Sequence, residues 1–115
     1  MAMSVSPSPD TLQLVLCTCP QSEARDLAQS LVSQRLAACV NILPSVSSVY
    51  RWDEQVVAED EALLIIKTCA DQREALFTQL AELHPYAVPE IISLPAGSVW
   101  PGYQAWVRDE TRPLP

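Results

Sequence analysis

Two long runs decide the fold, 38-ACVNILPSVSSVYRW-52 and 56-VVAEDEALLIIKTC-69. The first is rich in Val, Ile and Tyr, and the second contains the fully apolar stretch 62–66, so both are typical of β-strands. The polar residues 53–55 between them serve as a turn, which predicts a long antiparallel hairpin. Pro44 lies inside the first run and cannot donate a hydrogen bond to a ladder, so we expect a bulge or a sheet edge there.

The segment before the hairpin predicts a strand and then a helix. Residues 11–18 are short, apolar and bounded by polar residues and a proline, as in a buried strand. Ser22 is a suitable N-cap for the helix that follows. Apolar residues then recur at three- and four-residue steps from Ala24 to Leu36, so one face of this helix is apolar.

The segment after the hairpin predicts a second helix, a strand and a last helix. Asp71 and Glu74 have the spacing of a capping box, and the residue before Pro85 avoids helical geometry, so this helix ends there. Residues 90–95 are typical of a short strand. Pro101 favours the first position of a short C-terminal helix.

The predicted order is β-α-β-β-α-β with an additional helix, which is the ferredoxin-like arrangement of the α+β class. We expect one domain at 11–110, with tails at 1–10 and 111–115. The two hairpin strands are longer than one small sheet needs, which leaves strand edge free to pair with a neighbouring copy.

Composition limits the partners of this chain. It has 115 residues, of which 49% are hydrophobic, and a mean hydropathy of +0.10, so burial against another copy is favoured. The net charge of −7 and the scattered Lys and Arg residues argue against nucleic acid and against an anionic membrane surface. The N-terminal residues lack the pattern of a signal peptide, so we expect a cytoplasmic protein with reduced cysteines.

Five strings taken together resemble the CutA family of divalent-cation tolerance proteins. They occur in order from about residue 12 to residue 107, and they are CTCP at 17–20, RLAACVNI at 35–42, SVYRW at 48–52, LLIIKT at 63–68 and HPYAVPEII at 84–92. The resemblance implies a homotrimer built through the long hairpins, similar in shape to the PII signalling proteins. It also implies an association with tolerance to divalent cations, copper above all.

The first candidate site is a metal site at Cys17, Cys19 and His84. Residues two apart on a strand share a face and lie about 6.6 Å apart, so the two thiols could hold a soft ion such as Cu(I), and imidazole suits copper and zinc. Cys17 and His84 match positions that the family associates with copper, whereas Leu83 stands where some members carry a second histidine. Alternatively, the cysteines are small core residues and the histidine satisfies a helix-end carbonyl.

The second candidate site contains Lys67, Tyr86, Glu90 and Trp52, which the resemblance would bring near an intersubunit cleft. Lys67 ends a very apolar strand, and a charge in such a place needs a partner, for which Glu90 is a candidate. The group is either a pocket for a small anion or metabolite, or an ion pair that orders the trimer. Trp52 is expected to pack across subunits.

Enzyme motifs are missing from the sequence. Gly97 and Gly102 are its only glycines, so it has no glycine-rich phosphate loop, and it has no Cys-x-x-Cys. We therefore expect a non-catalytic, trimeric divalent-cation tolerance protein that binds copper or, as the lesser alternative, zinc. The competing interpretation is a PII-like ligand-binding or scaffolding trimer in which metal has no physiological role.

Overall fold

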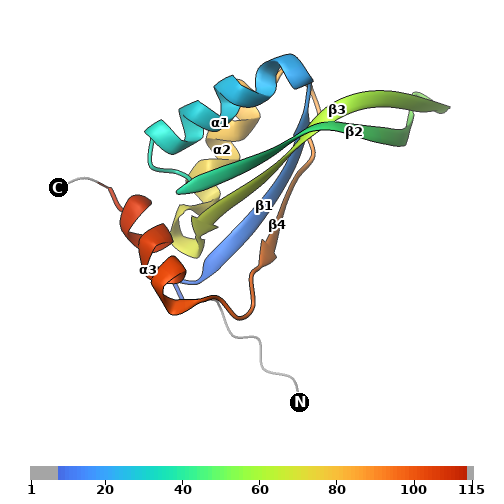
Figure 1. Cartoon of the computed structure of the whole chain (residues 1–115). Helices are drawn as coiled ribbons and strands as arrows, with labels where there is room; N and C mark the ends of the chain where they lie inside the picture. The colour runs from blue at the N-terminus through green and yellow to red at the C-terminus, as the bar shows by residue number, and fades with distance from the viewer. Residues whose placement is uncertain (1–7, 114–115) are drawn as a thin grey trace.

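The computed structural model describes residues 8–113 and has the predicted element order (Figure 1). The strands and helices are β1 (Leu12–Cys19), α1 (Ala24–Ser33), β2 (Cys39–Trp52), β3 (Gln55–Cys69), α2 (Arg73–Leu83), β4 (Ile91–Pro95) and α3 (Pro101–Glu110). Single 3₁₀ turns, Gln21–Glu23 and Ala70–Gln72, precede α1 and α2.

The four strands form one antiparallel sheet in the order β2-β3-β1-β4. Helices α1 and α2 lie together on one face of this sheet, whereas α3 lies at the opposite face near one end of the strands (Figure 1). This arrangement confirms the predicted ferredoxin-like α+β fold.

The β2–β3 hairpin projects beyond the rest of the sheet as a two-stranded arm, residues 46–61 (Figure 1). It begins where β1 ends, because Cys19 at the end of β1 pairs with Ala62. The ladder shifts register between Leu43 and Val46, so the bulge predicted at Pro44 is confirmed. The arm also explains why the radius of gyration is 15.3 Å, when a compact chain of this length would have about 13 Å.

The predicted helix starts were wrong in detail. Neither Ser22 nor the Asp71–Glu74 pair caps a helix, and no side chain makes a capping hydrogen bond at α1 or α2. Each helix instead begins with its 3₁₀ turn, in which backbone groups close the first turn.

Helix α1 ends earlier than its apolar pattern suggested. Arg35 adopts a left-handed conformation with φ of +61°, and the N–H of Leu36 donates to the carbonyl of Leu31. This is a Schellman motif with arginine at the position that glycine usually takes. Leu36 therefore packs against the core from outside the helix.

The main core lies between the sheet and the two helices α1 and α2. It contains alternate residues of β1 and β3, including Val15, Leu64 and Ile66, packed against Leu31 and Leu76. A second cluster lies under α3, where Val107 is buried against strand-end residues.

The sheet face opposite α1 and α2 is apolar and largely uncovered. The register places on it Leu16, Leu43, Leu63, Ile65, Ile92 and Leu94. Leu43, Ile92 and Leu94 are 39–47% exposed. We call these six residues the open sheet face.

The two ends of the described chain are tied to the domain. The N–H of Asp71 donates to the Pro9 carbonyl, and the Gln104 side chain donates to the Asp10 carbonyl. Thr111 is buried, and its hydroxyl donates to the Val107 carbonyl over 2.8 Å. The rest of the predicted tails, 1–7 and 114–115, lies outside the described residues. Within the described chain no helix is long and apolar enough to cross a membrane.

Candidate functional site: a buried thiol pair and an acidic cleft

Cys17 and Cys19 share one face of β1, as predicted, and this face turns toward α1 and α2. Both thiols are fully buried in the main core. Burial, together with the smaller effects of neighbouring Cys19, Glu90 and Glu61, raises the pKa of Cys17 to about 12. Burial, followed by nearby carboxylates, raises the pKa of Cys19 to about 11. Both thiols are therefore protonated at neutral pH.

His84 follows α2 and is 7% exposed. Its Nε2 is 2.8 Å from the carbonyl oxygen of Thr18, and its Nδ1 accepts a hydrogen bond of 3.1 Å from the N–H of Tyr86. Because the backbone carbonyl can only accept, this pattern assigns the proton to Nε2. The imidazole thus lies against the residue between the two cysteines.

The structure brings an imidazole to the strand segment that carries two thiols, but all three groups are engaged. Both imidazole nitrogens are hydrogen-bonded, and both thiols are packed in the core. In residues 8–113, no three His, Cys, Asp or Glu side chains are grouped so that they could hold a metal ion. Copper binding at Cys17 and His84 stays a prediction. We also expected that His84 could satisfy a helix-end carbonyl, but its Nε2 contacts the Thr18 carbonyl of β1, so the side chain connects the end of α2 to β1.

A cleft of about 700 Å³ opens where the arm leaves the sheet. Its lining comes from the arm, the end of β1 and the loop before β4, and consists of Thr18, Ser48, Val49, Tyr50, Trp52, Val57, Glu59, Glu61, Tyr86, Val88 and Glu90. Three of the predicted site residues, Tyr86, Glu90 and Trp52, are therefore together. The peptide bonds before Pro85 and Pro89, which flank this part of the chain, are trans.

Glu61 and Tyr86 form a hydrogen bond within the cleft. The Tyr86 hydroxyl donates to a carboxylate oxygen of Glu61 over 2.9 Å, and Glu61 is only 5% exposed. Burial and this carboxylate raise the pKa of Tyr86, and Glu59 likewise raises the pKa of Tyr50 through a hydrogen bond. With three carboxylates, three large aromatic rings and no Lys or Arg in its lining, the cleft suits a positively charged group.

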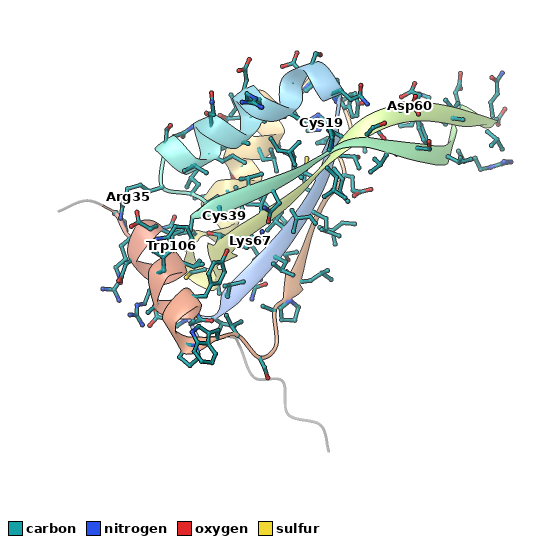
Figure 2. All side chains as sticks on the ribbon, in the orientation of Figure 1. Cys19, Arg35, Cys39, Asp60, Lys67 and Trp106 are labelled. Atoms are coloured by element: carbon teal, nitrogen blue, oxygen red, sulfur yellow. The ribbon has the colours of Figure 1, made fainter. Side chains whose placement is uncertain are left out.

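Lys67 does not reach this cleft, which corrects the expectation of a cation beside Glu90. On β1, Lys67 pairs with Leu14, whereas the residue after Glu90 pairs with Cys17. Lys67 and Glu90 are therefore about four residues, or roughly 13 Å, apart along the sheet. Lys67 instead lies beside Cys39 near α3 (Figure 2). Without this cation the cleft does not fit the small anion that we expected.

Sequence reasoning missed Glu59, Glu61 and Tyr50. The spacing of Glu59 and Glu61 was a usable signal, because residues two apart on a strand face the same side. What the sequence could not show was that this side faces Tyr86, which arrives from a loop 25 residues further along the chain.

Comparison with known proteins agrees with the geometry. Residues 13–110 match the family model described as CutA1 divalent ion tolerance protein. The divalent-cation tolerance protein CutA of Thermus thermophilus is 45% identical over 100 residues, which are 86% of this chain and 97% of the relative. A solved structure of Cut A1 from this organism has a TM-score of 0.85 and covers 88% of this chain and 99% of its own.

Two more distant structures have the same fold. The PII-like protein CutA of Nostoc is 30% identical with a TM-score of 0.83, and the match covers 87% of this chain and 97% of the Nostoc chain. The CutA of Archaeoglobus fulgidus, described as periplasmic, is 25% identical with a TM-score of 0.85 and coverages of 88% and 99%. The family match spans almost the whole domain, and this chain therefore belongs to the CutA1 divalent ion tolerance protein family.

Proposed function

We propose that this chain is a non-catalytic, cytoplasmic homotrimer that binds copper in a metal-response role, with Cys17 and His84 as ligands and Cys19 beside them. The observation that carries this proposal is the contact, at 2.8 Å, of His84 Nε2 with the backbone carbonyl of Thr18, the residue between the two cysteines in the sequence. It places the one histidine of the sequence against the residue that separates the two cysteines on β1. Sulfur and imidazole donors are those that copper prefers.

The number of donors favours Cu(I) over zinc. Structural zinc sites use four tetrahedral ligands, whereas within residues 8–113 no three His, Cys, Asp or Glu side chains are grouped for a metal, so a site with few ligands, as a soft ion such as Cu(I) accepts, is the better match. Copper must also displace thiol protons held with pKa values of about 12 and about 11. Uptake should therefore release protons and strengthen as the pH rises.

The trimer is supported by the open sheet face and by the arm. A two-stranded hairpin is at best marginally stable alone, yet the arm exposes 69% of Val49, 56% of Trp52 and 71% of Val56. Neighbouring copies that cover the arm and the open sheet face would bury this apolar surface.

Native mass spectrometry with Cu(I) and Zn(II) tests the metal proposal. About one copper per subunit is expected, lost in Cys17→Ser and in His84→Gln and retained in Cys69→Ser, which alters a buried thiol elsewhere. His84→Gln is preferred to alanine because its amide can still donate to Thr18. Copper uptake that persists in both Cys17→Ser and His84→Gln would refute this site.

The cleft supports a second function, that of a PII-like trimer that binds a small ligand without physiological metal. Its volume of about 700 Å³ and its lining of carboxylates and aromatic rings are the specific observations in favour. A small organic cation would find charge partners in Glu61 and Glu90 and an aromatic face in Trp52.

Titration followed by NMR separates the two functions. Spermidine and choline serve as cationic probes, and citrate serves as the anionic control. Shifts at the cleft with the cations alone, abolished in Glu61→Gln and unchanged in the exposed α2 variant Glu82→Gln, would favour the cleft function. If no probe shifts the NMR signals of the cleft and the protein takes up copper, the cleft function is rejected and the copper function is retained.

A further inference from the structure

The four cysteines of this chain differ in their surroundings. All four are free thiols, and Cys17, Cys19 and Cys69 are buried whereas Cys39 is half-buried. Burial raises the pKa of each buried thiol, which keeps them in the poorly nucleophilic protonated form. Access for a small oxidant is therefore best at Cys39, at the start of β2.

Lys67 is held directly beside Cys39. The two residues are partners in the β2–β3 ladder, and the N–H of neighbouring Ala38 donates to the Lys67 carbonyl over 2.9 Å, which secures the register. The Lys67 Nζ is 3.9 Å from the Cys39 Sγ (Figure 2). No ion pair joins Lys67 to a carboxylate within residues 8–113.

Helix α3 covers this pair from one side. Burial raises the pKa of Tyr103, and the neighbouring Cys39 thiol raises it further, so Tyr103 lies next to the sulfur. The pair is thus a small, half-buried cluster of nucleophilic groups, bordered by β2, β3 and α3, and separate from both the acidic cleft and the Cys17–His84 region.

We propose that Cys39 is the peroxide-reactive thiol of this protein and that Lys67 captures its oxidised form as a sulfur–nitrogen bond. In the first step the Cys39 sulfur attacks hydrogen peroxide, the O–O bond breaks, and a sulfenic acid and water form. The sulfur is oxidised by two electrons and the peroxide is reduced.

In the second step Lys67 Nζ, after its ammonium proton has passed to water, attacks the sulfenic sulfur. The S–N bond forms, the S–O bond breaks, and the hydroxide leaves as water with one amine proton. The pair has then lost two hydrogen atoms. An added thiol attacks the sulfur and releases the amine, which takes up the thiol proton, while Cys39 is left in a mixed disulfide. A second thiol group, such as that of dithiothreitol, then attacks this disulfide and restores the free Cys39 thiol.

The geometry favours this product over its alternatives. Cross-strand partners are held in one register by the ladder, so the amine stays near the sulfur while other nucleophiles must diffuse in. The product would be a covalent link between β2 and β3 at the end of the sheet that lies under α3.

Peptide mapping after peroxide treatment of the full chain tests the proposal. Trypsin normally cuts after Arg35, Arg51, Lys67 and Arg73. A linked lysine resists trypsin, so the expected product is peptide 36–51 joined to an uncut peptide 52–73, two hydrogens lighter than their sum and released by dithiothreitol.

The uncut Lys67 distinguishes this link from a disulfide between Cys39 and Cys69. The disulfide would give the same mass loss but would leave Lys67 open to cleavage. Lys67→Arg and Lys67→Met should abolish the link and leave Cys39 as a sulfenic acid that dimedone labels. Oxidation that begins at Cys17 or Cys19, or cleavage after Lys67 in the oxidised wild type, would overturn the proposal.

Discussion

At the scale of single residues, Arg35 combines an unfavourable backbone with favourable side-chain contacts. Its φ of +61° costs a non-glycine residue about 1 kcal/mol. Its guanidinium donates to the carbonyls of Asp109 and Arg112, which ties the end of α1 to the end of α3. The contacts outweigh the strain, since hydrogen bonds from charged donors contribute about 1.5–3 kcal/mol each.

This balance gives the first prediction. Arg35→Ala should lower the free energy of unfolding by about 3 kcal/mol, because two hydrogen bonds of about 1.5 kcal/mol each are lost and the strain stays. Arg35→Gly should lower it by about 1 kcal/mol less, because glycine adopts this conformation without strain. Urea unfolding of both variants measures the difference, and equal values would mean that the backbone at residue 35 is unstrained.

The buried thiols give a pH-dependent prediction. The folded pKa values of about 12 for Cys17 and about 11 for Cys19 lie above the ordinary value of 9.0. Their contribution to stability is complete below pH 9 and is lost as the pH rises, because the unfolded chain ionises first. From pH 9 to 11 each thiol should lower the free energy of unfolding by up to about 1.4 kcal/mol per pH unit.

Urea unfolding at pH 8 and pH 10.5 checks this thiol effect. Cys17→Ala should flatten the decline, whereas Val15→Ala, a core change on the same strand face, should lower stability equally at both pH values. A decline as steep in Cys17→Ala as in the wild type would show that the Cys17 thiol is not its cause.

At the scale of elements, the turn of the arm is a weak point. Asp53 and Glu54 have φ of +51° and +65°, which is the type I′ geometry that favours Asn-Gly. Glu54→Gly should therefore raise the free energy of unfolding by about 0.5–1 kcal/mol, whereas Glu54→Ala should give no such gain. Thermal unfolding of the two variants is the measurement, and a Gly variant no more stable than the Ala variant would contradict the assignment of strain.

The sequence predicted the elements that depend on long local patterns. The hairpin and the bulge at Pro44 follow from strand composition and from the missing proline N–H. Helix starts were not predictable in the same way, because the chain closes its first turns with backbone hydrogen bonds where Ser22 and Asp71 offered side-chain caps.

At the scale of the whole molecule, the sequence did not show which candidate site residues lie close together in space. Lys67 and Glu90 both suited a cleft by residue type, but only the register shows that they lie about four residues apart along the sheet. Glu61 and Tyr86, by contrast, meet because the loop before β4 returns to the base of the arm. Contacts between segments distant in sequence depend on the register and the loop path, which local patterns do not contain.

The same scale carries the prediction about assembly. Ile92 on the open sheet face is 47% exposed, and Val32 on α1, on the other side of the sheet, is 41% exposed. In a single subunit, aspartate at either position should lower the free energy of unfolding only slightly, because water still reaches the carboxylate. In a trimer that covers the open sheet face, only the Ile92→Asp carboxylate would be buried without a partner, which is strongly unfavourable.

Native mass spectrometry should accordingly find the wild type and Val32→Asp at about three times the subunit mass of 12.7 kDa. Ile92→Asp should appear at the mass of one subunit. A trimer that survives Ile92→Asp but is lost in Val32→Asp would move the interface to the helical side. In that case the arm and the open sheet face would require a different partner, because their exposed apolar side chains would still be uncovered.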